Sequence, residues 1–535
     1  RPEYGERWGR HWLDVVRFAQ SNGYERDGEK AQIWKYRDYV IQAFDEDKPY
    51  NRFVIEQLAG DELPDATAAS RAATGFYRLG VWDDEADDPR QAEFDDLDDV
   101  MVTTGAAFLG VTLGCCRCHD HKFDPLPQED YYRLLAYFRN VQRYTDPRPT
   151  LGSSTFLPTI DTSQFASVVA QHETRRADAR AKLETATGSE REALEAILRE
   201  ETLAIAESDW TNGVREASSV AQVVHVLIRG NAGQAGAVVE PGLPQIFGGQ
   251  TLAVEPIDGP LASSGRRLAL ARWIADESHP LTARVMVNRV WYHHFGKGIV
   301  PTTTDFGKAG LPPTHPELLD WLAAEFMQQG WSVKSLHRLI MTSETYRRSS
   351  QQEVSLRVAE SLGPTADGLT EDPMLVDPGN DWYWRANLRR LNAEAVRDSM
   401  LAISGQLNPE RGGRGFFPPL AGEVLAGGSR PGAGWGVSNE LQQNRRSVYM
   451  FVKRTLSSPW LDLFDYNNLT QPIAERSITT VAPQALMLLN DDFMLKQAEA
   501  LAARVRRESR DDLALQLARA LELAVQRKPT EHEQH

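Results

Sequence analysis

The stretch Cys115-Cys116-Arg117-Cys118-His119 decides how the rest of the chain is interpreted. The pattern C-x-x-C-H is the attachment signature of c-type haem. Two thiols one helical turn apart can form thioethers with the two vinyl groups, while the adjacent imidazole reaches the iron. The segment therefore predicts one covalent haem c, with Cys115 and Cys118 as anchors and His119 as the proximal iron ligand.

A metal ion other than haem iron is the alternative for the same segment. Thiolates and imidazoles suited to tetrahedral zinc are present in Cys115, Cys116, Cys118, His119 and His121. A structural zinc site usually takes its ligands from two separated pairs, and all 3 Cys of the chain lie here. The spacing favours haem, and Cys116 is expected to be a small buried side chain.

Helical patterns flank this segment and dominate the chain. Apolar residues at helical spacing predict helices over 6–20, 34–44, 51–58, 94–109 and 131–138, and then over 266–275, 281–295, 315–329, 332–343 and 392–404. Gly296 and Gly330 are predicted C-terminal caps, and Thr314 with Glu317 a capping box. Four carboxylates of the helix over 94–109 are expected to form its solvated face: Asp95, Asp96, Asp98 and Asp99.

Changes in composition divide the chain into three parts. Residues 1–150 read as a helical cytochrome-like module, and 263–535 as a mainly helical companion module. Between them, Ala, Glu and Arg over 164–207 indicate a projecting helical hairpin. β-Branched residues over 220–228, followed by a Gly/Pro-rich stretch, indicate a small β insert. The predicted fold is mainly α: a multi-helical protein of two modules with a hairpin and a β insert.

Length and charge restrict the classes of function. The 535 residues carry a formal net charge of -16, which argues against nucleic acid and favours a basic redox partner or a cation. No apolar run approaches the roughly 18 to 20 residues that span a bilayer. Both ends interrupt helical patterns and are interpreted as truncations, so a missing signal peptide says nothing of the compartment.

Haem iron has a second axial position, and the sequence offers several donors for it. The candidates for this distal ligand are His11, His293, His294, His315 and Met101. Adjacent side chains on a helix point about one hundred degrees apart, so only one of His293 and His294 is expected to face inward, and His294 is the choice. His121 is too close to His119 to reach the opposite face, and is expected to make a hydrogen bond with Asp120 or with local backbone.

Two further segments could bind ligands. The acidic loop Asp83–Asp88 offers oxygens for calcium but lacks the spacing of a known calcium loop. The aromatic run Trp382–Trp384, which includes Tyr383, could stack on sugar rings, although such a cluster is more often part of a core.

Many short motifs in the right order resemble a known domain pair. The first part of the chain resembles the planctomycete-type cytochrome domain family in Gly5-Glu6-Arg7-Trp8, His11-Trp12-Leu13-Asp14, Ser21-Asn22-Gly23-Tyr24-Glu25, Gln57-Leu58-Ala59-Gly60-Asp61 and Cys118-His119-Asp120-His121-Lys122. The second part resembles the companion domain of unknown function in Asn288-Arg289-Val290-Trp291, His294-Phe295-Gly296, Asp305-Phe306-Gly307, the stretch from His315 to Leu322, and Pro483-Gln484-Ala485-Leu486.

This resemblance covers nearly the whole chain. It implies a large exported protein, periplasmic or extracellular, often with another cytochrome domain upstream, from bacteria rich in polysaccharide-degrading genes. The expected function is that of a haem-binding redox protein, for electron transfer or a haem-dependent oxidation. The alternatives are a carbohydrate-active or carbohydrate-binding protein with an accessory haem, and a zinc-stabilised interaction protein.

Overall fold

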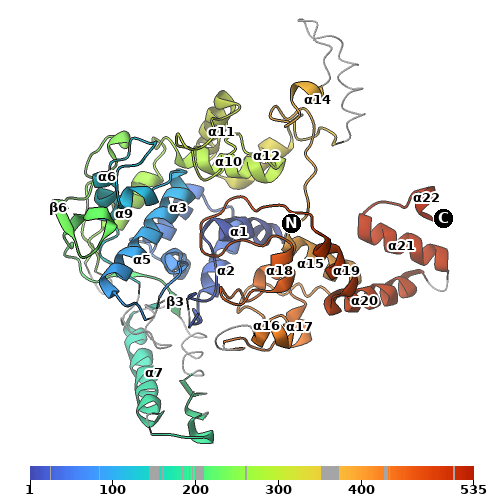
Figure 1. Cartoon of the computed structure of the whole chain (residues 1–535), viewed down its shortest axis with the longest axis horizontal. Helices are drawn as coiled ribbons and strands as arrows, with labels where there is room; N and C mark the ends of the chain where they lie inside the picture. The colour runs from blue at the N-terminus through green and yellow to red at the C-terminus, as the bar shows by residue number, and fades with distance from the viewer. Residues whose placement is uncertain are drawn as a thin grey trace, which may run out of the picture. The chain divides into compact units, whose positions relative to one another are not determined.

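The chain forms two compact units, which are described separately here (Figure 1). Unit 1 comprises Arg1–Phe18, Asn22–Arg389 and Leu469–Ala474, and unit 2 comprises Ala19–Ser21, Arg390–Asn468 and Glu475–His535. The computed structural model describes all residues except 25, 84, 144–155, 159–161, 184, 192, 196, 199–209, 259–261, 351–372, 427–431, 433, 510–511 and 535.

The first helices of unit 1 surround an apolar core. They are α1 (Tyr4–Val15), α2 (Trp34–Asp45), α3 (Tyr50–Ala59), α4 (Ala68–Ala73), α5 (Pro89–Thr104) and α6 (Gln128–Leu135). The first predicted helix is too long, because Arg17 takes a φ of 50° and turns the chain out of α1. Helix α5 begins where the Asp88 carboxylate accepts the backbone N–H groups of Arg90 and Gln91.

A second group of helices in unit 1 comprises α9 (Arg266–Ile274), α10 (Thr282–Phe295), α11 (Pro316–Gln328) and α12 (Val333–Met341), followed by the short α14 (Pro373–Val376). Gly296 is the C-cap of α10 at a φ of 78°, as predicted, whereas Gly330, at a φ of 72°, follows Gln329, the C-cap of α11. The predicted capping box is wrong, because His315 is the N-cap and the Thr314 hydroxyl donates instead to the Ile299 carbonyl.

Helix α10 is joined to the end of α5 by a buried cation. Helix α5 continues into a π-turn, Gly105–Leu109, that ends at Gly110 with a φ of 59°. The Arg289 guanidinium of α10 donates to the carbonyls of Ala106 and Ala107 in that turn. Burial lowers the pKa of Arg289 to about 10, so it stays charged at neutral pH beside these helix-end carbonyls.

The segment between these two groups of helices holds the hairpin and three small sheets. Helix α7 (Thr162–Leu183) packs on the segment that returns from it through a cluster of Ala179, Ala186 and Leu194. The part of the predicted hairpin over 199–209 lies outside the described residues. The antiparallel strand pairs are β1 (Val141–Gln142) with β4 (Arg215–Glu216), β2 (Phe156–Pro158) with β3 (Trp210–Asn212), and β5 (Val224–Leu227) with β6 (Ala235–Val239).

Unit 2 is helical as well. Its helices are α15 (Ala393–Ser404), α16 (Gly422–Ala426), α17 (Glu440–Gln443), α18 (Pro459–Leu463), α19 (Ala482–Asn490), α20 (Asp492–Ser509), α21 (Leu513–Val525) and α22 (Glu531–Gln534). Buried Arg445 donates to the carbonyls of Gly412 and Arg414, and so orders the segment that precedes α16. The predicted fold class, mainly α with a small β insert, is confirmed. Among the described helices, none has the length and apolar character that a bilayer-spanning helix requires.

Candidate functional site

The C-x-x-C-H segment sits on a single turn of 3-10 helix, η3 (Gly114–Arg117). Cys115 and Cys118 are exposed on this turn, whereas Cys116 is buried. The Cys116 thiol points inward, with its Sγ 3.5 Å from the Leu126 carbonyl oxygen. Burial, aided by the neighbouring Cys115, raises the pKa of the Cys116 thiol to about 12. The two predicted anchors are therefore accessible, and the third thiol is buried, as predicted.

The exposed His119 ring is held in one tautomer. Its Nδ1 lies 2.7 Å from the carbonyl oxygen of Asp120. Because a carbonyl oxygen can only accept, Nδ1 carries the hydrogen and Nε2 carries the lone pair. Histidine ligands of metals are commonly oriented by such a bond from the other ring nitrogen. The donor set of His119 thus fits a proximal iron ligand.

Arg117, between the anchors, fixes the turn to α5. Its guanidinium pairs with Asp95 and lies 3.7 Å from Asp98, while its carbonyl accepts the Tyr132 hydroxyl at 2.8 Å. The prediction of a solvated acidic face on α5 is therefore wrong for Asp96, Asp98 and Asp99, which are half-buried, whereas Asp95 is exposed. Two further pairs of the same helix join Asp96 to Arg143 at 3.1 Å and Asp99 to Arg17. Burial raises the pKa of Asp96 to about 6.

The loop after His119 is tied to local backbone and to a distant segment. The His121 Nδ1 accepts the N–H of Asp124 at 2.9 Å, as expected for a locally bonded histidine. Asp124 in turn accepts the N–H of Lys308 at 2.7 Å. Cys116 and His121 are thus occupied elsewhere, and within the described part of the chain no three His, Cys, Asp or Glu side chains are grouped to hold a metal ion. The side chains do not converge as a zinc site requires.

Three of the five candidate distal ligands, His11, His293 and His294, lie in an aromatic cluster around Trp8. The Nε2 of His294 is 3.0 Å from the Nδ1 of His337 on α12, whereas His293 stacks on His11 of α1 with ring centroids 3.6 Å apart. Both adjacent histidines are packed, because α1 and α12 each present a ring to the last turn of α10. Burial lowers the pKa of His294 to about 4.

Among the described residues, no ring in contact with His294 belongs to the segment Cys115–His119. Of the other two candidates, His315 contacts Tyr383, and Met101 is fully buried on α5. The choice of His294 as distal ligand stays a prediction.

The acidic loop is engaged in local contacts. Asp88 caps α5, Glu85 pairs with Arg26, and the Asp83 carboxylate accepts the Glu85 N–H at 3.0 Å. Asp84 lies outside the described residues. These contacts leave the calcium prediction untested.

The aromatic run Trp382–Trp384 is divided between core and surface. Tyr383 is buried against Trp291 and Phe295, and the Trp384 indole donates to the Asp377 carbonyl. Trp382 is 64% exposed. Of the three rings, Trp382 is the one that presents a face to a ligand.

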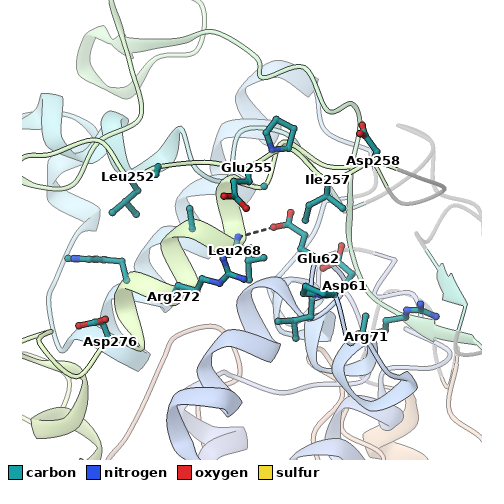
Figure 2. Close-up of a pocket in the computed structure, with 18 of the residues that line it drawn as sticks. Asp61, Glu62, Arg71, Leu252, Glu255, Ile257, Asp258, Leu268, Arg272 and Asp276 are labelled. Atoms are coloured by element: carbon teal, nitrogen blue, oxygen red, sulfur yellow. Dashed lines mark hydrogen bonds between the residues drawn. The ribbon is translucent and has the colours of Figure 1, made fainter.

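A second candidate site is a cavity of about 920 Å³ beside the end of α3. Figure 2 shows its walls: Asp61, Glu62 and Arg71 on one side, with Leu252, Glu255, Ile257, Asp258 and the α9 residues Leu268 and Arg272 around them. The Glu62 carboxylate accepts the N–H of Leu268 at 2.8 Å. Buried Arg267 binds Asp61 at 2.8 Å and Glu62 at 2.7 Å. These two carboxylates neutralise a buried guanidinium.

Comparison with known families gives a match for two segments of the chain. Residues 266–535 match the family model described as "PSD1: Protein of unknown function (DUF1553)". The chain belongs to the PSD1 family. Residues 1–143 match the model "PSCyt2: Protein of unknown function (DUF1549)", so the resemblance to a planctomycete-type domain pair is confirmed at that level. Neither curated proteins nor solved structures yield a match.

In this PSD1 protein, the stability of unit 1 is expected to depend on the protonation of Glu62. Burial raises its pKa from 4.5 to about 7, so its contribution to stability is full below pH 4.5 and is lost as the pH rises through 7. The shift corresponds to about 3 kcal/mol at most. Urea unfolding at pH 5 and pH 8 should show a smaller pH dependence in Glu62→Gln than in the wild type. Glu255→Gln, in the same cavity but exposed, is the control and should keep the wild-type dependence; a Glu62→Gln variant that keeps it too would contradict the assignment.

Proposed function

We propose that the segment Cys115–His119 carries one covalently attached c-type haem and that the protein is an exported redox protein. The observation that supports this most directly is the local geometry. Two exposed thiols flank a buried one, and the exposed imidazole beside them makes its hydrogen bond through Nδ1, so that Nε2 can face a ligand. The proposed activity is electron transfer or a haem-dependent oxidation, and export follows from the resemblance described above.

Each residue of the segment has a defined task in this proposal. Cys115 and Cys118 would hold the haem through two thioethers, each formed when a thiol S–H adds across a vinyl group, so that the hydrogen goes to the neighbouring vinyl carbon and no group leaves. His119 offers Nε2 to the iron while the Asp120 carbonyl holds its Nδ1–H, which keeps the ring oriented and more basic. Once bound, the haem supplies one-electron chemistry at a potential set by its ligands and surroundings.

The surroundings of the segment favour a fixed attachment point. Arg117 is bound through both its guanidinium and its carbonyl, to α5 and α6 respectively. The Asp120 carboxylate accepts the N–H of Gln128 at 2.8 Å, at the start of α6. A turn anchored on both sides in this way holds the two thiols and the imidazole in place before the cofactor arrives.

The wild-type protein provides the direct test. When it is expressed with an export signal and the haem-ligation machinery, it should show a Soret band that survives acid-acetone extraction, because thioether bonds are covalent. The haem content should be one per chain, since the sequence holds one C-x-x-C-H segment. The same chain expressed in the cytoplasm is the control and should carry little haem. Complete extraction of haem from the exported protein would contradict covalent attachment.

A further inference from the structure

The turn that follows β5 lies directly against the second anchor, Cys118. A Cβ atom built on Gly230 would be 2.8 Å from the Cys118 Sγ, closer than real Cβ contacts allow. The Gln128 side-chain amide donates both to the Arg117 carbonyl at 2.9 Å and to the Leu227 carbonyl at 3.0 Å. One side chain thus links the cysteine turn to the end of β5.

The shape of this turn is imposed by its backbone. Arg229 and Gly230 both take the left-handed conformation, at φ of 55° and 71°. Beyond them, the Ala232 N–H donates to the Gln91 side chain of α5 at 2.9 Å. Because of this conformation, the turn passes Cys118 with only a hydrogen where another residue would place a side chain.

A second part of the same insert reaches the loop after His119. In the short helix η5 (Gln245–Phe247), the N–H of Gln245 donates to the Asp130 carboxylate at 2.7 Å. Ile246 helps to line a cavity of about 350 Å³ together with Asp120, His121 and Leu126. Ile246 is 52% exposed, and Ile228, in the turn beside Cys118, is 50% exposed.

The exposed apolar residues Ile228 and Ile246 lie outside both segments that match a family model. The matched segments are 1–143 and 266–535, so the β5 turn and η5 belong to neither. A covalently held porphyrin on an exposed turn would itself expose a large apolar surface, and apolar neighbours reduce that cost.

We propose that this insert supplies one wall of the haem site. Ile228 and Ile246 cover the porphyrin, and Gly230 leaves the space that the thioether at Cys118 needs. The inference rests on the proposed function, since it assigns the surroundings of the same cofactor. It predicts that changes in the insert alter the attached haem without any change in Cys115, Cys118 or His119.

The first test replaces the two apolar residues. Ile228→Asp with Ile246→Asp should keep one covalent haem per chain, because the anchors are intact. Its midpoint potential should fall, since carboxylates and water near the haem favour the oxidised iron. Val220→Asp is the control, an apolar residue of the same insert that is 74% exposed. Equal potentials in the double variant, the control and the wild type would overturn the inference.

The second test concerns the space at Cys118. Gly230→Ala places a methyl group at the Cys118 sulfur and should yield chains attached through Cys115 alone, seen by mass spectrometry of haem peptides. Gly233→Ala is the control in the same turn, since its nearest neighbour is the Asn231 side chain. Full attachment at Cys118 in both folded variants would overturn the role of Gly230. A wild-type protein without covalent haem would instead overturn the proposed function itself, so the two failures are distinguishable.

Discussion

Arg267→Met is expected to lower the free energy of unfolding of unit 1 by about 3–5 kcal/mol, the usual result of removing one partner from a buried ion pair. The Arg267 side chain is fully buried, and it neutralises Asp61 and Glu62 at hydrogen-bond distance. A third buried carboxylate, Glu216, lies 3.6 Å away. Methionine fills much of the volume but removes the guanidinium that pairs with all three buried carboxylates. The loss should grow as the pH rises through about 7, because Glu62 then loses its proton.

Urea unfolding followed by tryptophan fluorescence measures this effect. Arg272→Met is the matched control, because Arg272 lies on the same helix but is exposed. Surface substitutions of this kind usually change stability by no more than about 0.5 kcal/mol. Equal unfolding midpoints for the two variants would show that the buried network contributes little.

This ion network explains why unit 1 contains residues from both family segments and from the insert between them. Asp61 belongs to the segment that matches PSCyt2, Arg267 to the segment that matches PSD1, and Glu216 to the insert between them. Arg289 makes a second link, from α10 to the π-turn before the cysteine segment. Buried charges with partners in another module tie the modules together, since separating them would leave these charges unpaired.

The helices of this fold could be predicted from periodicity, because each apolar stripe is a local property of the sequence. The ends of these helices depend on backbone turns and on contacts with other segments, which the spacing of apolar residues does not predict. The Arg17 backbone turns the chain out of α1, and the Thr314 hydroxyl bonds a carbonyl on another segment instead of capping α11. Helix α4 has a capping box between Thr67 and Ser70, a signal that could have identified it.

The acidic side of α5 illustrates a different limit. Four carboxylates on one helix read as a solvated face, since charged residues are mostly exposed. Their partners are Arg17, Arg117 and Arg143, which precede or follow the helix in the chain. Nothing in the helix itself indicates that these arginines fold back onto it. The same holds for His293, whose partner His11 comes from α1.

Candidate residues that are adjacent in the sequence could be predicted. Neighbours that distant segments contribute through folding could not. Cys115, Cys118 and His119 were found because their spacing in the sequence carries the chemistry. The Asp120 carbonyl that orients His119 needed the structure, as did Gly230 and Ile246, which lie more than a hundred positions further on. No pattern in the insert marks it as a neighbour of the cysteine turn, since its contacts depend on tertiary packing.

Replacement of both anchors should have the largest effect on the cofactor. Cys115→Ser with Cys118→Ser is expected to abolish all haem that survives acid-acetone extraction, because serine hydroxyls do not form thioethers. Each single variant should retain at most one thioether per chain. Pyridine haemochrome spectra and the mass of the intact protein measure both results.

Cys116→Ser is the matched control for these variants and should keep the wild-type haem content. The side chain at this position is buried and directed at the Leu126 carbonyl, and a serine hydroxyl can donate to the same oxygen. If Cys116→Ser removed the metal centre while the double variant kept it, a thiolate cluster would replace the haem proposal. Retention of covalent haem in the double variant would mean that the attachment lies outside this segment. The three thiols lie within four positions but differ in exposure. Comparing the anchor variants with Cys116→Ser therefore separates the effect of losing a thioether from the effect of replacing any cysteine in the turn.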